Sequence, residues 1–124
     1  MKNNFYFKEP FLNIYKLPNS RSEVTSQILY GERFKILSKR KGWIKIKSLY
    51  DRYSGFIKNK NYVKELKISH KVSNIQAYIF KNPSIKTKKT LYFGSKLSVS
   101  EKRNGFVKFE KNRWVKLKDI KKIT

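Results

Sequence analysis

An internal repeat restricts the fold of this chain more than any other feature of its sequence. Four segments recur in the same order: IYKLP (14–18) as IFKNP (79–83), LYG (29–31) as YFG (92–94), KGWIK (41–45) as NGFVK (104–108), and FIK (56–58) as WVK (114–116). The spacing between matched segments is 65, 63, 63 and 58 positions, and the last drop arises because the second copy has no counterpart of SLYDRYSG. The chain therefore reads as a tandem duplication, with its boundary near residues 67–73.

Both copies carry the alternation of half-buried β-strands. Ile44 and Ile46 alternate with lysines, as do Val115 and Leu117 in the second copy. A turn pair ending in glycine, Lys-Gly or Asn-Gly, separates two such strands in each copy, where a tight hairpin belongs. No stretch shows a sustained helical period, so we predict an all-β protein of two small tandem barrels.

The alternation also predicts which apolar side chains form the two cores. In the first copy these are Ile14, Phe34, Ile36, Ile44, Ile46 and Ile57. In the second copy they are Ile79, Leu97, Val99, Val107, Val115 and Leu117. A domain of ~60 residues buries only about 60% of its unfolded surface, so each copy alone would be marginally stable.

The net charge is +23, from 31 Lys and Arg against 8 Asp and Glu in 124 residues. Such a balance favours nucleic acid or another polyanion as a partner. The charge is evenly spread, however, at +11 over residues 1–68 and +12 over residues 69–124. Lysine enrichment also follows from biased genome composition. A polyanion partner and a purely compositional origin of the charge therefore both stay open.

The reactive residues exclude several kinds of site within these 124 residues. Cysteine is absent and His70 is the only histidine. Disulfides, thiolate zinc sites and a cysteine nucleophile are therefore excluded, and a nucleophile–base pair has little support. We expect no enzyme activity, no metal and no cofactor.

The order LNIYKLP, QILYGERFKIL, KGWIKIK and DRYSGFI resembles bacterial SH3-like domains. It is most similar to the tandem N-terminal pair of NlpC-type, dipeptidyl-peptidase-like cell-wall cysteine peptidases. The resemblance implies two SH3-like barrels, at residues 1–67 and 72–124, the second shorter and without the Asp-x-Tyr-x-Gly step. It also implies that the family's catalytic domain is not part of this sequence. The chain would then be either a separate or truncated gene product, or a fragment of a longer protein.

The same resemblance suggests ligand-binding residues. In the family, the Asp-x-Tyr-x-Gly strand helps to form the pocket for the amino end of a murein peptide. Tyr53 would line that pocket with Asp51 beside it, and Glu32 is a second candidate acid. A peptide ammonium needs carboxylate or phenol oxygens to accept its N–H bonds. A purely structural alternative stays open, in which Asp51 starts a turn and Gly55 permits a close backbone approach.

These features favour a non-catalytic binding and targeting module that selects substrate for a murein-peptide endopeptidase. Its expected partners are a murein peptide, an NlpC-type catalytic domain, or both, with weak nucleic-acid binding through net charge. The alternative is a basic SH3-like barrel that binds RNA or another polyanion. Recognition of a proline-rich peptide ranks last because acidic residues are few. We expect a cytoplasmic protein, since no apolar run reaches the ~20 residues of a membrane-spanning helix and no signal peptide is evident.

Overall fold

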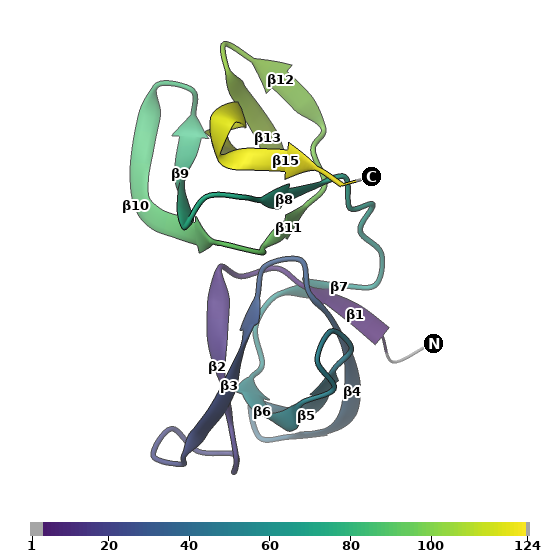
Figure 1. Cartoon of the computed structure of the whole chain (residues 1–124). Helices are drawn as coiled ribbons and strands as arrows, with labels where there is room; N and C mark the ends of the chain where they lie inside the picture. The colour runs from purple at the N-terminus through teal and green to yellow at the C-terminus, as the bar shows by residue number, and fades with distance from the viewer. Residues whose placement is uncertain (1–3, 124) are drawn as a thin grey trace. The chain divides into compact units, whose positions relative to one another are not determined.

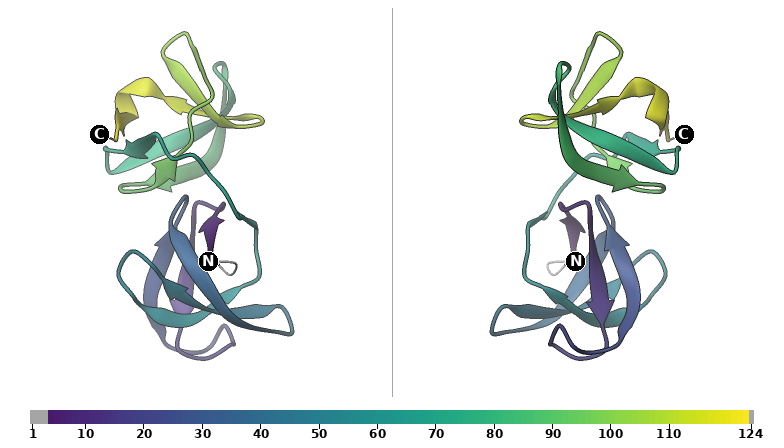
Figure 2. Two further views of the ribbon diagram at one scale, coloured as in Figure 1. Left: turned by 90° about the vertical axis from the view of Figure 1, so that its right-hand side faces the viewer. Right: turned by 90° about the vertical axis from the view of Figure 1, so that its left-hand side faces the viewer.

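The computed structural model describes residues 4–123 and divides the chain into two compact units, Met1–Glu65 and Leu66–Thr124. Each unit consists of short antiparallel strands joined by turns (Figure 1). Within the described residues the helical structure is one short 3-10 turn, η1 (Leu117–Asp119), and the two side views show the same all-strand construction (Figure 2). The all-β, SH3-like fold expected from the sequence is confirmed.

The first unit is a single curled sheet around one core. Its strands are β1 (Asn4–Phe7), β2 (Phe11–Tyr15), β3 (Val24–Leu29), β4 (Arg33–Arg40), β5 (Trp43–Ser48), β6 (Ser54–Lys58) and β7 (Tyr62–Val63). They are hydrogen-bonded in the order β3-β2-β6-β5-β4-β1-β7. The inward side chains of these strands make the core, with Phe5 and Tyr62 packed edge to face at its margin.

The second unit has the same kind of chain path but two sheets. Its strands are β8 (His70–Val72), β9 (Gln76–Asn82), β10 (Ile85–Tyr92), β11 (Lys96–Leu97), β12 (Glu101–Arg103), β13 (Phe106–Glu110), β14 (Arg113–Lys116) and β15 (Ile120–Lys122). Five of them pair in the order β10-β9-β14-β13-β12, and three in the order β11-β8-β15.

Closed barrels are the part of the expected fold that is wrong, because both units are built from open sheets. In the first unit the edge strands β3 and β7 do not pair with each other. Strand β7 has only two residues, and both pair with β1. In the second unit residues 98–100 lie between β11 and β12 outside any strand, which separates the ladder into two sheets.

Ten of the twelve predicted core residues are buried. All six of the first copy are buried, and in the second copy the exceptions are Val99 and Leu117. Leu117 is 40% exposed because β14 ends at Lys116 and the chain enters η1, so the strand alternation stops one residue early. Val99 is half-buried because it lies in the break between β11 and β12.

The two units share the same hairpin turn. Lys41 and Gly42 have φ of 46° and 81°, and Asn104 and Gly105 have φ of 51° and 80°. Two consecutive left-handed residues match the twist of a two-residue hairpin. The carbonyl of each turn glycine also accepts a backbone hydrogen bond. Gly42 accepts from the amide of Asn59, the residue after β6, at 2.9 Å. Gly105 accepts from the amide of Leu117, the residue after β14, at 2.8 Å.

A second shared turn joins β3 to β4 and β10 to β11. The amide of Glu32 donates to the Leu29 carbonyl at 3.1 Å, and the amide of Ser95 donates to the Tyr92 carbonyl at 2.9 Å. The glycine before each of these residues ties the turn to the first strand of its unit. The amide of Gly31 donates to the Phe7 carbonyl, and the amide of Gly94 donates to the Val72 carbonyl. The same scaffold thus occurs twice, while independent folding of residues 1–67 and 72–124 stays a prediction.

Candidate ligand pocket in the first unit

Gly55 fixes the position of the loop that carries the candidate site. A Cβ atom at Gly55 would lie 2.5 Å from Ile14 Cγ2 and 2.8 Å from the Tyr15 carbonyl oxygen. Strand β6 therefore approaches β2 too closely for any side chain at this point. The glycine of the Asp-x-Tyr-x-Gly step has a structural role, which is the close approach that the sequence left open.

The loop between β5 and β6, residues 49–53, is held by its own hydrogen bonds. Asp51 Oδ1 accepts from the Tyr53 amide at 3.3 Å, which is an Asx turn. The Ser48 amide donates to the Tyr53 carbonyl at 2.7 Å, and Ser48 Oγ accepts from the Tyr50 amide at 3.3 Å. Arg52 lies in the left-handed region with φ of 66°. Asp51 therefore does organise a turn, and its carboxylate is held in place by that turn.

Glu32 follows the β3–β4 turn and is 7% exposed. Its Oε1 atom accepts a hydrogen bond from the Leu29 amide at 2.8 Å. Because Gly31 has φ of 81°, the turn brings the Glu32 side chain back over the end of β3. A buried carboxylate must be paired or hydrogen-bonded, and this amide is one of its donors.

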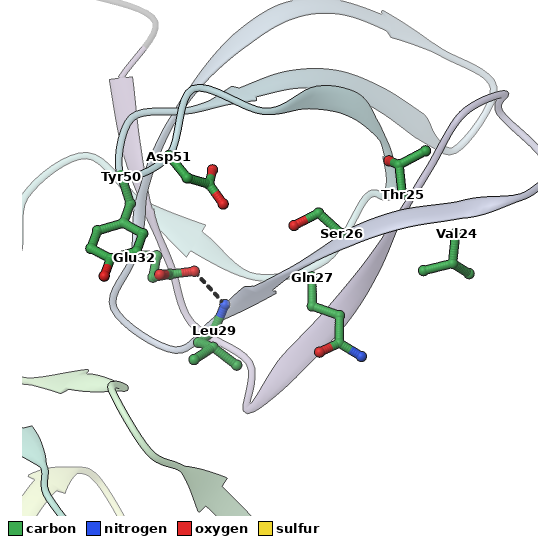
Figure 3. A pocket seen from close by; sticks show the side chains of 8 residues that line it. All are labelled: Val24, Thr25, Ser26, Gln27, Leu29, Glu32, Tyr50 and Asp51. Atoms are coloured by element: carbon green, nitrogen blue, oxygen red, sulfur yellow. Dashed lines mark hydrogen bonds between the residues drawn. The ribbon is translucent and has the colours of Figure 1, made fainter.

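The two carboxylates line one open hollow of about 450 Å³. Its lining residues come from β3, the β3–β4 turn and the β5–β6 loop: Val24, Thr25, Ser26, Gln27, Leu29, Glu32, Tyr50 and Asp51. In Figure 3 the Asp51 carboxylate and the Ser26 hydroxyl point into the same space, while the Tyr50 ring lies beside Glu32. No lysine or arginine is among these eight residues, although the chain carries 31 of them.

Asp51 and Glu32 line the same hollow, whereas the third predicted residue, Tyr53, does not. Tyr53 is 47% exposed at the end of the loop and is not among the residues that line the hollow. Tyr50 lines it instead and is 72% exposed. Neither Tyr50 nor the polar edge of β3 was predicted from the sequence. The insertion SLYDRYSG, present in one copy only, was the signal that could have identified Tyr50.

The hollow suits a ligand that carries a cationic N–H donor and a short polar backbone. Two carboxylates supply acceptors for an ammonium, and the Ser26 hydroxyl adds a polar group that points into the same space. Thr25 and Gln27 also line the hollow, but their side chains donate to the Ile14 carbonyl and to Asn13 Oδ1, both at 3.2 Å. The volume falls within the range of small-molecule sites, about 300–1,000 Å³. The residues that line the hollow include no cysteine and no histidine.

Comparison with known proteins finds one family model that matches part of the first unit. Residues 14–61 match the model of the bacterial dipeptidyl-peptidase SH3 domain. The match runs from within β2 to beyond β6 and includes the candidate loop, so this part of the first unit is similar to a bacterial SH3 domain of this kind. The resemblance to bacterial SH3-like domains that the sequence indicated is thus confirmed.

A solved structure extends the likeness to the second unit. The chain resembles an NlpC/P60 family protein from Bacillus cereus ATCC 10987, with a TM-score of 0.71 and 11% identity, over 97% of this chain and 56% of that chain. At this identity the likeness shows the fold. The chain thus spans little more than half of that protein's length. No curated protein matches the chain.

Residues 4–123 contain no helix of the length and apolar character needed to cross a bilayer.

Proposed function

We propose that this chain is a non-catalytic SH3 module that selects murein peptides for an NlpC-type endopeptidase. The observation that supports it best is the acidic hollow inside the family-matched region, in a chain that is otherwise strongly basic. Asp51 and Glu32 would receive the α-ammonium of a peptide with a free amino end. The module would supply this end of the substrate site, while the hydrolytic residues belong to the catalytic domain.

Both carboxylates are positioned before a ligand arrives. The Leu29 amide orients Glu32 at 2.8 Å, and the Tyr53 amide orients Asp51 at 3.3 Å. A site whose acceptors are already fixed loses less conformational entropy on binding. Charge-assisted hydrogen bonds from an ammonium to a carboxylate are also stronger than neutral ones. The proposed contacts therefore favour a cationic amino end over an acylated one.

Tyr53 has a different role in this proposal. Its ring is half-exposed at the mouth of the β5–β6 loop and outside the lining of the hollow. From there its phenol would contact the catalytic domain or the part of the peptide that extends out of the hollow. The proposed partners are accordingly a murein peptide and an NlpC-type catalytic domain.

The proposal is tested by titrating the chain with a murein tripeptide at physiological salt, using calorimetry. We expect the peptide with a free amino end to bind, and its N-acetylated form to bind more weakly. Asp51→Asn should weaken binding about fivefold, because an exposed ion pair contributes up to roughly 1 kcal/mol. Glu65→Gln is the matched control, since it removes one exposed acid of the same unit outside the hollow.

Equal affinity for the free and acetylated peptides would contradict the proposed contact with the ammonium. An equal loss in Asp51→Asn and Glu65→Gln would show that the peptide responds to net charge and not to the hollow.

A further inference from the structure

The ribbon formed by β9 and β10 in the second unit lies in a stretch without acidic residues. From Leu66 to Ser100 the chain has seven lysines and no Asp or Glu. The three acids of this unit lie elsewhere and are paired. Glu101 bonds Arg103 at 2.8 Å, Glu110 lies 3.6 Å from Arg113, and Asp119 accepts from Asn74 at 2.6 Å. The positive charge of the ribbon therefore has no acidic counterpart on the ribbon itself.

A bulge in β10 concentrates this charge. Lys86 pairs with Phe80 and Thr90 pairs with Tyr78, so Thr87, Lys88 and Lys89 stand opposite the single residue Ile79. Thr87 Oγ1 closes the bulge by donating to the Ile79 carbonyl at 2.6 Å and accepting from the Lys89 amide at 3.1 Å. With Thr87 bonded back to β9, the side chains of Lys88 and Lys89 are exposed to solvent.

An aromatic ring on the outer face of β9, that of Tyr78, lies next to Lys86, the residue that precedes the bulge. Tyr78 is 40% exposed, and Lys86 Nζ lies 3.7 Å from its ring centroid. Gln76, two residues before it and therefore on the same face, donates through Nε2 to the Tyr78 hydroxyl at 3.3 Å. Alanine and isoleucine alternate with these residues on the buried face. The outer face thus combines a ring, an amide and Lys86, and the bulge beside it carries the exposed Lys88 and Lys89.

Protection of the sheet edge does not account for this cluster. Lysines and bulges on an edge strand do discourage edge-to-edge pairing, and β10 is an edge strand. In the first unit the equivalent edge strand is β3, whose sequence VTSQIL has no charge. It has a bulge at the equivalent place, where Thr25 Oγ1 donates to the Ile14 carbonyl at 3.2 Å. The fold therefore needs the threonine at this edge and does not need the lysines.

We propose that the outer face of the β9–β10 ribbon binds single-stranded nucleic acid. Lys86, Lys88 and Lys89 would contact successive phosphates, and Tyr78 would stack on a base while Lys86 moves from the ring to the backbone. Single-strand binders combine a basic track with an aromatic platform in this way. A polymer that carries phosphates without bases would use the lysines only, so the ring is the feature that favours nucleic acid.

The test is fluorescence anisotropy with a labelled oligo(dT) 12-mer across a salt series. The Lys86→Gln/Lys88→Gln/Lys89→Gln variant should lower the slope of log K against log salt by about 2 units, at roughly 0.7 per phosphate contact. Lys111→Gln/Lys118→Gln/Lys121→Gln is the matched control, since it removes the same charge from exposed positions off the ribbon and should leave the slope nearly unchanged.

Tyr78→Leu separates stacking from charge. Stacking of one base contributes about 1–3 kcal/mol, so we expect oligo(dT) to bind roughly 5- to 150-fold more weakly. Binding of inorganic polyphosphate, which has no base, should change little. Circular dichroism and thermal melting of each variant show that the fold is retained.

Three results would overturn the proposal. The first is an equal loss of oligo(dT) binding in the ribbon and control triple variants, which would indicate diffuse charge. The second is unchanged oligo(dT) binding in Tyr78→Leu, which would indicate attraction of any phosphate polymer. The third is no oligo(dT) binding by the wild-type chain at physiological salt.

Discussion

The connections β5–β6 and β13–β14 occupy the same place in the two units and differ in length. The first spans residues 49–53 and carries Tyr50 and Asp51, whereas the second is the two-residue turn 111–112. Around them the pairing is the same: Ile44 faces Ile57 in one unit, and Val107 faces Val115 in the other. The scaffold does not need the longer loop, which is therefore the part of the first unit open to a ligand-binding role.

The β3–β4 turn and its counterpart, the β10–β11 turn, also share a scaffold and differ in the side chain that accepts a hydrogen bond, which is Glu32 in the first unit and Ser95 in the second. Glu32 accepts from the Leu29 amide at 2.8 Å, and Ser95 accepts from the Tyr92 amide through Oγ at 3.4 Å. A hydroxyl thus does in the second unit what a carboxylate does in the first. Glu32 differs from Ser95 in carrying a carboxylate, and it lines the hollow with Asp51.

The largest effect on this comparison should come from Gly55→Ala. The added Cβ would meet the Tyr15 carbonyl oxygen at 2.8 Å, so β2 and β6 must separate. We expect the first unit to lose about 2–3 kcal/mol of unfolding free energy. Each unit has one tryptophan, so urea unfolding by fluorescence in a Trp114→Phe background reports on the first unit through Trp43.

Arg113→Ala at the equivalent position of the second unit is the control, followed through Trp114 in a Trp43→Phe background. It removes only a partly exposed ion pair with Glu110 and should cost about 1 kcal/mol or less. A Gly55→Ala variant as stable as wild type would show that β2 and β6 are not as close as described.

Replacement of the turn acceptor Glu32 should separate its contribution to the stability of the turn from its contribution to peptide binding. Glu32→Ser copies Ser95, keeps an oxygen near the Leu29 amide, and should cost less than about 1 kcal/mol. Glu32→Leu leaves that amide without this acceptor and should cost about 1–3 kcal/mol. Both variants should bind the murein tripeptide more weakly than wild type. Full peptide affinity in Glu32→Ser would remove Glu32 from the proposed site.

Exchange of the hairpin residues should have a smaller effect of predictable sign. Lys41 has φ of 46° and Asn104 has φ of 51°. Asparagine tolerates this region better than lysine, so Lys41→Asn should stabilise the first unit by about 0.5 kcal/mol and Asn104→Lys should destabilise the second by a similar amount. Opposite signs in thermal melting would show that side-chain contacts, and not the backbone, set the preference.

The smallest effect concerns pH and only the second unit. Burial and the positive charges of Lys102 and Lys122 lower the pKa of His70 below 6.5. As pH falls below 6.5, the unfolded chain takes up this proton first, so stability of the second unit should fall until folded His70 also protonates. Phe5 is the equivalent of His70 in the first unit, because Phe5 pairs with Phe34 as His70 pairs with Leu97. Phenylalanine does not titrate, so the first unit should lack this pH dependence.

The matched variant is His70→Gln, which should remove this part of the pH dependence. Urea unfolding between pH 7 and pH 5, followed through Trp114, measures it. A pH dependence that is unchanged in the variant would assign the effect to another group.

The sequence predicted the strands and most of the core, because alternation and Gly turns are local signals. Closure of the barrels was predicted wrongly, since it depends on whether distant edges such as β3 and β7 meet. Leu117 continued the alternation, yet the chain left the strand at Lys116. The acids Asp51 and Glu32 were identified from the family motif, whereas their shared hollow depends on a turn and a loop that are 19 positions apart. The SLYDRYSG insertion could have pointed to Tyr50, but only the fold shows that the edge of β3 lines the same hollow.

The central claim is that the same scaffold carries an acidic peptide site in the first unit only. The most direct measurement is a titration of the isotope-labelled chain with the murein tripeptide at physiological salt, followed by amide NMR shifts. The account predicts saturable shifts at Leu29, Glu32, Tyr50 and Asp51, with the equivalent residues of the second unit, Tyr92, Ser95 and 111–112, unchanged. Shifts of equal size in both units, or none in the hollow at millimolar peptide, would contradict it.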